Sequence, residues 1–193
     1  TETPAFQLLP VVKLPAAVDL RPQCSPVEDQ GNLGSCTGQA IVGALEYLEN
    51  KSHWSQKNNV FVDLSRLFVY YNERLMEGTV KIDAGASISD GIKSLVTYGV
   101  CNEKLWPYTI NKFAVKPTPA AYTDATTKKI KVYARVSTAN NIAGIQQTLA
   151  SGYPVIFGFL VYAGFVSSTV AKTGAVALPN VGEQLLGGHA VLM

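Results

Sequence analysis

The chain has 193 residues, of which 47% are hydrophobic and 16% charged, a composition that builds a sizeable buried core and excludes intrinsic disorder. Its net charge of +2 comes from 16 basic and 14 acidic residues with no basic block, which argues against nucleic acid as a partner. No apolar run reaches the roughly 18 residues of a transmembrane helix, so the sequence predicts no membrane span.

Residues 1–14 are predicted to form an N-terminal arm or the remnant of a propeptide. Pro4 and Pro10 interrupt this segment, and it carries no apolar periodicity. It also lacks the basic start and small-residue cleavage site of a signal peptide. We therefore expect any export signal to be absent from this stretch, which leaves the compartment open at this point.

The first helix is predicted to begin after Ser35, which fits an N-cap, and to hold Cys36 in its first turn. Apolar side chains recur downstream at the spacing of one helix face: Ala40, Ile41, Ala44, Leu45 and Leu48. Unpaired backbone N–H groups and the helix dipole favour negative charge at a helix start. Cys36 is thus predicted to lie where a thiolate is stabilised.

Two further helices are predicted before residue 100. One begins after Ser65 and ends at Gly78, and the other begins near Ser87 or Ser89 and ends at Gly99. Serine caps helix starts with its hydroxyl, and glycine accepts the left-handed conformation that often follows a helix end. The first hundred residues are therefore predicted to be mainly helical.

The second half of the chain is predicted to be mainly β-structure. A Pro-, Thr- and Ala-rich stretch after the aromatic turn 106–108 (WPY) is typical of a segment crossing between two lobes. A short helix is predicted to end at Gly152. Alternating or β-branched runs predict strands at four places: 130–136, 154–162, 174–178 and 189–193.

The chain contains two histidines, and their surroundings differ. His53 lies in a polar stretch just past the first helix, where we expect a solvated or capping role. His189 follows Gly187 and Gly188 at the start of an apolar strand, where the glycines permit close approach of another backbone. Its position suits either a satisfied core histidine or the general base that a nucleophilic cysteine requires.

The motifs around these residues resemble, in chain order, those of the papain family of cysteine peptidases. Residues 18–21 (VDLR) and 29–36 (DQGNLGSC) are similar to its VDWR and QGxxGSCW elements, and 187–191 (GGHAV) is similar to its histidine strand. His189 follows Cys36 by 153 residues, close to the range of about 130–150 for such enzymes. The form QGxxGSCT is nearest in style to bacterial members of the C1 family.

The resemblance implies an α+β papain-like fold of two lobes with the active site in the cleft between them. Residues 15–110 would form the mainly helical left lobe that carries the nucleophile. Residues 111–193 would form the β-barrel-like right lobe that carries the histidine, apparently truncated at its C-terminus. No cofactor and no metal are implied.

Roles are implied residue by residue. Cys36 matches the nucleophile, His189 the base and then acid, and Gln30 the side-chain donor of the oxyanion hole, which it shares with the Cys36 backbone N–H. The reaction is acyl transfer from a peptide or protein substrate through a thioester. These residues are expected to act as one constellation.

Substrate-binding positions are implied as well. Gly85 and Ala86 align with the glycine pair that hydrogen-bonds to an extended substrate, although a turn explains Gly85 equally well. Gly188, immediately before the histidine, is expected beside the same substrate. The substrate is therefore expected to bind as an added β-strand.

This sequence departs from the family's pattern at several positions. Thr37 stands where an aromatic residue follows the nucleophile, and Leu33 replaces the usual disulfide cysteine. In the family an Asp or Asn that orients the histidine follows it, but residues 190–193 (AVLM) contain neither. Asn180 comes before His189 and is therefore out of order. We expect a C-terminal continuation or a second chain to supply that residue. A longer inhibitory propeptide is expected before residues 1–14.

Cys24 and Cys101 remain after Cys36 is assigned. Because Leu33 removes the usual partner, a Cys24–Cys101 bridge is one expectation, and two buried thiols are the other. A zinc site is disfavoured because no C-x₂-C spacing occurs.

Three functions fit these residues. The first is a secreted or otherwise extracytoplasmic endopeptidase. The second is a catalytically impaired binding or regulatory protein on the same scaffold, since the orienting asparagine is missing. The third is acyl transfer to an amine in place of water, which uses the same two residues.

Overall fold

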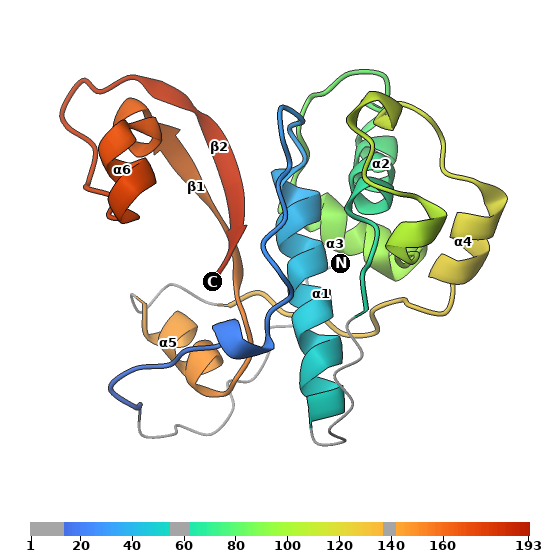
Figure 1. Cartoon of the computed structure of the whole chain (residues 1–193), viewed down its shortest axis with the longest axis horizontal. Coiled ribbons are helices and arrows are strands. Elements are labelled where there is room, and N and C mark those ends of the chain that lie inside the picture. The colour runs from blue at the N-terminus through green and yellow to red at the C-terminus, as the bar shows by residue number, and fades with distance from the viewer. Residues whose placement is uncertain (1–13, 55–61, 137–141) are drawn as a thin grey trace.

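The computed structural model describes residues 14–54, 62–136 and 142–193, and its elements fall into two groups (Figure 1). One group contains α1 Cys36–Trp54, α2 Arg66–Glu77, α3 Ile88–Thr97 and α4 Pro119–Ala125. The other contains α5 Ala143–Ala150, β1 Ile156–Tyr162, α6 Ser168–Thr173 and β2 Leu185–Leu192. Short 3₁₀ turns occur at Arg21–Gln23, Glu103–Leu105, Ile110–Lys112 and Ala163–Val166. A helical part followed by a mixed part is the α+β class predicted.

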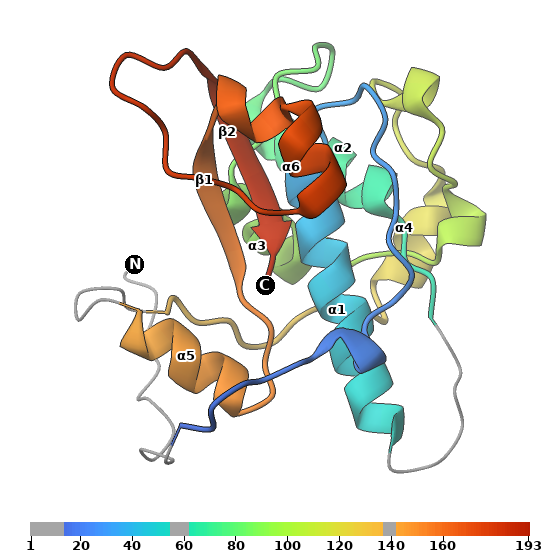
Figure 2. The same ribbon diagram turned by 60° about the vertical axis from the view of Figure 1, so that its left-hand side comes forward.

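Helix α1 stands between the two groups and contacts both. It packs against α2 and α3 on one side and against β2 on the other, as Figures 1 and 2 show from two directions. Ile41 and Val42 on this helix are fully buried in a core shared with α2 and α3. At Gly38 the helices approach so closely that a Cβ would lie 2.9 Å from the Arg66 carbonyl oxygen. The start of α1 is therefore fixed against α2.

The predicted caps of α2 and α3 are confirmed. The Ser65 hydroxyl accepts a hydrogen bond from Phe68 N–H at 3.1 Å, and the Ser87 hydroxyl accepts one from Asp90 N–H at 3.1 Å. Gly78 follows α2 with φ 75°, the left-handed conformation expected of a helix end. Of the two serines proposed for the start of α3, Ser87 is thus the cap.

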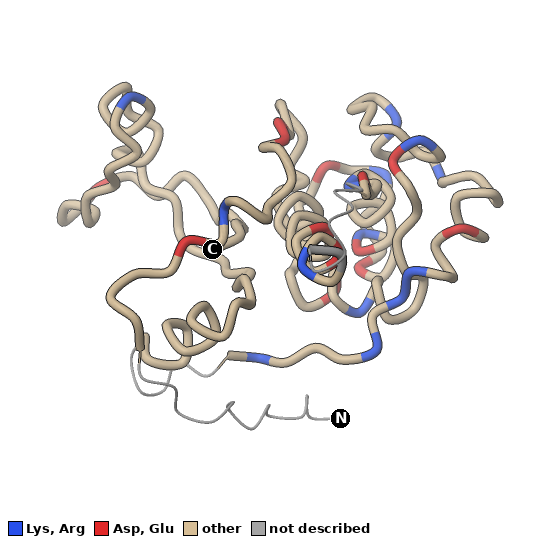
Figure 3. Tube along the Cα trace, turned by 60° about the horizontal axis from the view of Figure 1, so that its bottom comes forward, with Lys and Arg blue, Asp and Glu red and all other residues tan. Residues whose placement is uncertain are grey.

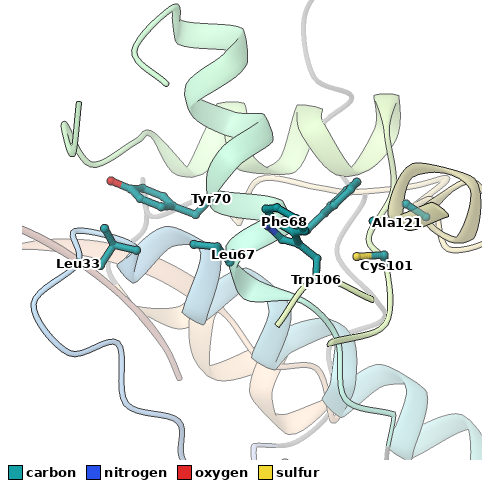
Figure 4. Close-up of a cluster of buried hydrophobic side chains, with 8 residues drawn as sticks. Leu33, Leu67, Phe68, Tyr70, Cys101, Trp106 and Ala121 are labelled. Carbon is teal, nitrogen blue, oxygen red and sulfur yellow. The ribbon is translucent and has the colours of Figure 1, made fainter. Parts of the chain in front are cut away.

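A second hydrophobic core anchors the loop before α1. Figure 4 shows Leu67 and Phe68 of α2 in the middle of this cluster and Tyr70 of the same helix toward the end that holds Leu33. Leu33 packs at one end, and Cys101 and Ala121 pack at the other. Burial of such side chains contributes about 1.5–3 kcal/mol each to folding. Because Leu33 is three residues before Cys36, this core also holds the loop that leads into α1.

The two strands form one antiparallel ribbon that carries the histidine. Strand β1 pairs with β2 so that Phe159 lies opposite His189. The predicted strands at 154–162 and 189–193 are confirmed, and the second begins earlier than predicted, at Leu185. The predicted short helix before Gly152 is also confirmed as α5.

Two predicted strands are wrong. Residues 130–136 and 174–178 have no regular secondary structure, and Val132 and Leu178 are 74% and 91% exposed. A strand needs a neighbour to pair with its backbone N–H and C=O groups. In the described part of the chain, such pairing is confined to β1 with β2 and to one isolated bridge between Leu64 and Asn102, so side-chain alternation alone did not predict these strands correctly.

Two short helices were not predicted. Part of the presumed crossing segment forms α4, where the Thr118 hydroxyl accepts a hydrogen bond from Ala121 N–H and Pro119 occupies the first turn. A serine cap at Ser167 likewise starts α6.

The predicted arm lies outside the described residues except for Leu14. None of the described helices is both long and apolar enough to cross a bilayer.

Gly99 offers a test of this packing. Its φ is 79°, and a Cβ there would lie 2.0 Å from the Ala125 carbonyl oxygen. We expect Gly99→Ala to lower the free energy of unfolding by about 3 kcal/mol, from left-handed strain plus overpacking. Chemical denaturation measures the change. Gly78→Ala is the control, since Gly78 has similar φ but open space around it. An equal loss in both variants would contradict the clash.

Candidate active site

One cleft of about 640 Å³ collects the residues that the sequence singled out. The start of α1 and the loop before α3 form one wall, and β1 and β2 form the other. The six predicted catalytic and substrate-binding residues all line it: Gln30, Cys36, Gly85, Ala86, Gly188 and His189. They come from three separate segments of the chain, 30–36, 85–86 and 188–189, so the fold itself brings them together.

Cys36 is the first residue of α1 and is half-buried. The first hydrogen bond of the helix runs from Gln39 N–H to the Ser35 carbonyl at 3.0 Å. The N–H groups before Gln39, including that of Cys36, therefore lack a helical acceptor. Such a helix start stabilises a thiolate and an oxyanion formed beside it.

The cleft wall formed by β1 and β2 belongs to a part of the chain with few formal charges. From residue 142 onward the only charged residues are Lys172 and Glu183, and Figure 3 shows the charged positions gathered on the helical group. The α1 helix start and the imidazole of His189 are therefore the groups that can stabilise negative charge at Cys36 from the two walls.

Gln30 is fastened to the loop that leads into α1. Its Nε2 donates to the Leu33 carbonyl at 2.9 Å, which leaves a second N–H on that amide for a ligand. The Tyr108 hydroxyl donates to the Gln30 carbonyl at 2.9 Å and pairs with the Ser35 hydroxyl at 2.6 Å. Tyr108 thus ties Gln30 to the residue before Cys36. Ser35 uses its side chain for this tie and not as the predicted helix cap.

Tyr108 is in turn held by charged neighbours. The Arg66 guanidinium lies 4.7 Å from the centre of the Tyr108 ring. The Tyr108 backbone N–H donates a hydrogen bond to the Glu103 carboxylate at 2.5 Å. Arg66 pairs with Glu28 at 2.8 Å and with Glu103 at 3.7 Å. The aromatic turn 106–108 was noted from the sequence as a landmark, but nothing local revealed that it holds the catalytic loop.

Asp83 connects the loop before α3 to the nucleophile loop. Its carboxylate accepts from Gly34 N–H at 3.0 and 3.1 Å and from the Tyr70 hydroxyl. The same hydroxyl accepts from Gly85 N–H at 3.2 Å. Gly85 has φ 69°, so it is a turn residue as well as part of the cleft wall. Sequence reasoning missed Asp83 because its partners are 13 and 49 residues away.

His189 lies on β2 among aromatic rings. Phe159 and Phe165 meet its imidazole at centroid distances of 5.8 and 6.5 Å. Burial lowers the pKa of His189, so the ring favours the neutral form that accepts a proton. Among the described residues no side chain hydrogen-bonds to the imidazole. Asn180 instead pairs with Glu183, to which its backbone N–H donates at 2.9 Å.

The predicted Cys24–Cys101 bridge is wrong. All three cysteines are free: Cys24 is exposed, whereas Cys101 is buried in the core of Figure 4. The Cys24 thiol donates to the Leu20 carbonyl at 3.5 Å. Burial raises the pKa of Cys101 to about 12, which makes it inert. The sequence order of cysteines did not reveal that one belongs to a surface loop and the other to the core.

No group of three or more metal-binding side chains gathers anywhere in the described ranges. His53 was expected just past the first helix, yet α1 continues through Trp54. Its side chain lies outside the described residues.

Comparison with known proteins shows which family this chain belongs to. A sequence model of the papain family cysteine proteases matches residues 14–193. An uncharacterized peptidase C1-like protein of Acanthamoeba polyphaga mimivirus is 44% identical over 192 residues, which cover 96% of this chain. The chain spans 58% of the length of that relative.

Solved structures agree on the fold. Xylellain, a cysteine protease from Xylella fastidiosa, superposes with a TM-score of 0.82 at 36% identity, covering 97% of this chain and 73% of its own. Digestive procathepsin L 3 from the larval midgut of Tenebrio molitor has a TM-score of 0.63 at 18% identity over 98% of this chain and 59% of its own. The second likeness supports the fold alone. The predicted papain-like fold class is thereby confirmed, and the chain belongs to the papain family of cysteine proteases.

Proposed function

We propose that this protein is a cysteine endopeptidase that hydrolyses peptide bonds through a Cys36 thioester. His189 acts as general base and then acid, and Gln30 forms the oxyanion hole with the Cys36 backbone N–H. The observation that carries this proposal is the meeting of these three residues in one cleft at the start of α1. Family membership supports it independently.

The chemistry follows from the groups present. His189 accepts the thiol proton of Cys36, and the thiolate attacks the carbonyl carbon of the scissile peptide. The negative charge that develops on the carbonyl oxygen is stabilised by the N–H groups of Gln30 and Cys36. The protonated imidazole then donates its proton to the leaving amine, which yields the thioester. Water, deprotonated by His189, hydrolyses the thioester and restores the thiol.

The cleft walls suit an extended peptide substrate. Gly85 and Ala86 on one side and Gly188 on the other present backbone to the cleft without long side chains in the way, although the Gly85 N–H is already donated to Tyr70. Gly188 has open space around its Cα, where a substrate backbone fits. Phe159 and Leu160 add apolar surface, which suits a substrate with a hydrophobic side chain near the scissile bond.

The partners inferred are a peptide or protein substrate and the protein's own propeptide as inhibitor. Procathepsins among the similar solved structures support a proform. We infer that the residue orienting His189 comes from a C-terminal continuation or a second chain, and that the enzyme acts outside the cytoplasm.

Replacing Gln30 tests the oxyanion hole. We expect Gln30→Ala to lower kcat by about 10²–10³-fold with little change in KM, because its N–H stabilises charge that exists only in the transition state. Steady-state kinetics on a fluorogenic peptide measures this loss. The rate of Cys36 alkylation by iodoacetamide, which forms no oxyanion, should stay unchanged. A parallel loss in both measurements would indicate a disturbed loop in place of a missing donor.

Hydrolysis itself is tested by digesting a peptide mixture in water enriched in ¹⁸O. The proposal predicts ¹⁸O in the new C-terminal carboxylates, because water resolves the thioester. Added amine that is incorporated in preference to ¹⁸O would favour acyl transfer. The absence of any new termini from a folded, prosegment-free protein would contradict peptidase activity.

One observation favours the second candidate, a catalytically impaired binding or regulatory protein. Among the described residues the His189 ring has no hydrogen-bonding partner to fix its orientation. If this reading holds, the protein binds peptides in the cleft with micromolar or better affinity but leaves them intact. Isothermal titration with uncleaved peptide distinguishes the two.

A further inference from the structure

The residue after the nucleophile has a buried partner on the neighbouring helix. Thr37, 2% exposed, donates its hydroxyl hydrogen to the Glu73 carboxyl at 2.5 Å. Glu73 belongs to α2 and is fully buried. This hydrogen bond is a direct polar link between α2 and the first turn of α1, one residue from Cys36.

Glu73 forms no ion pair within the described part of the chain, and Arg74 is the one cation that favours its charge. The adjacent Arg74 directs its guanidinium elsewhere, to the backbone carbonyls of Tyr70, Val80, Ile82 and Phe113. The other charged groups facing Glu73 are acids, Glu77 from α2 and Asp90 from α3, and Asp90 is already paired with Lys93. From α1 it meets the hydroxyl of Thr37. An ionised Glu73 would therefore be an unpaired buried charge.

The second carboxyl oxygen of Glu73 is closely enclosed. Among the described residues Oε2 has no hydrogen-bond partner. It lies against Gly91 of α3, where an added Cβ would be 2.6 Å from this oxygen and 2.3 Å from Ile41 Cδ1. The site therefore has room for a neutral acid but not for the hydration that a carboxylate requires. Burial accordingly raises the pKa of Glu73 to about 8.

We propose that Glu73 is a positioning residue for Cys36: as a neutral acid it stays buried, accepts the Thr37 hydroxyl and holds the first turn of α1, and loss of its proton leaves a buried charge whose hydration separates α2 from that turn. The inference rests on the proposed function in taking Cys36 as the nucleophile. Its consequence is a loss of activity at alkaline pH although the thiolate fraction is then highest. Thr37, which departs from the family's aromatic residue, is thus given a role.

The test is the pH profile of kcat/KM for the wild type and Glu73→Gln between pH 6 and 10. Glutamine keeps a neutral, hydrogen-bonding side chain at every pH. With both profiles normalised at pH 6.5, we expect Glu73→Gln to retain about tenfold more activity than wild type at pH 9, one unit above the pKa. Deprotonation of the catalytic imidazolium lowers both profiles equally. Profiles that superimpose would overturn the proposal.

Three variants serve as controls. Glu77→Gln removes the same charge from the same helix without a contact to Thr37; because Glu77 raises the pKa of Glu73, this variant should move the alkaline loss to slightly lower pH, opposite to Glu73→Gln. Thr37→Val removes the hydroxyl and is expected to lower kcat at every pH. Thr37→Ser keeps the hydroxyl and is expected to keep the wild-type kcat. Thermal unfolding at pH 6.5 establishes that each variant is folded. A Glu77→Gln profile that shifts like that of Glu73→Gln would assign the effect to general charge and overturn the proposal.

A second measurement separates this inference from the proposed function. The rate of Cys36 alkylation by iodoacetamide reports on the thiol without requiring hydrolysis. We expect this rate to follow the thiolate fraction through pH 9 in Glu73→Gln and to fall below it in wild type. If the two proteins differ in alkylation rate in this way but neither hydrolyses peptides, the proposed peptidase function is refuted and the role of Glu73 stands. Normal hydrolysis with identical alkylation and activity profiles would refute the role of Glu73 alone.

Discussion

Replacing Cys36 by alanine is expected to lower kcat/KM for peptide hydrolysis by at least about 10⁴-fold, because no other group in the cleft can form the thioester. The residual rate would come from binding and the oxyanion hole alone. Steady-state assays at high enzyme concentration, with the ¹⁸O readout to exclude contaminating peptidases, measure the loss. The variant should remain folded, because Cys36 is half-buried at the helix start and its thiol packs in no core cluster.

Cys24→Ala is the matched control. Cys24 is an exposed free thiol outside the cleft, so its removal should leave kcat/KM within a factor of two. Activity that survives Cys36→Ala, or that is lost in Cys24→Ala with the fold intact, would show that Cys36 is not the nucleophile.

Replacing His189 by alanine is expected to lower kcat/KM by about 10³–10⁴-fold, because the thiol loses its base and the leaving amine loses its acid. The loss should be largest near pH 6. There the wild-type thiolate is stabilised by an imidazolium, whereas an isolated thiol with a pKa of about 8.5 is almost wholly protonated. The pH dependence of Cys36 alkylation checks this, because in His189→Ala the alkylation seen in the wild type at pH 6 should be largely lost.

Asn180→Ala accompanies this variant and addresses the orientation of the histidine. Asn180 pairs with Glu183 in the loop before β2, so it should not contribute to the reaction. A loss of tenfold or more in Asn180→Ala, with wild-type stability, would mean that this asparagine serves His189 after all. Alkylation of Cys36 at pH 6 that is equally fast with and without His189 would contradict the pairing of the two residues.

Cys36 and His189 were proposed because each lies in a short motif that resembles the pattern of the papain family. Cys36 follows a glycine-serine helix start, and His189 follows two glycines at a strand start. The caps at Ser65 and Ser87 were predictable for a different reason, since a cap depends on residues three positions away. Local chemistry therefore sufficed for most helix boundaries, whereas the roles proposed for Cys36 and His189 rest on the resemblance.

The ties that hold the site were not predictable. Tyr108 reaches Gln30 across 78 residues, Asp83 reaches Gly34 across 49, and Thr37 reaches Glu73 across 36. Such contacts depend on the tertiary fold, and a single sequence contains no signal for them. The strand predicted at 130–136 failed for a related reason, because strand formation requires a partner that sequence alternation does not specify.

The free thiols offer an internal comparison for the central claim, that Cys36 is an activated nucleophile in a substrate cleft. Partial desolvation of the sulfur and the nearby Asp19 carboxylate raise the pKa of Cys24, so this largely exposed thiol is protonated and unreactive at pH 6. A peptidyl vinyl sulfone needs both a thiolate and a cleft that binds its peptide part. Peptide mapping by mass spectrometry after labelling at pH 6 is therefore the most direct measurement. The account predicts a single adduct, on Cys36; a folded, prosegment-free protein that carries no adduct, or carries it on Cys24, would contradict it.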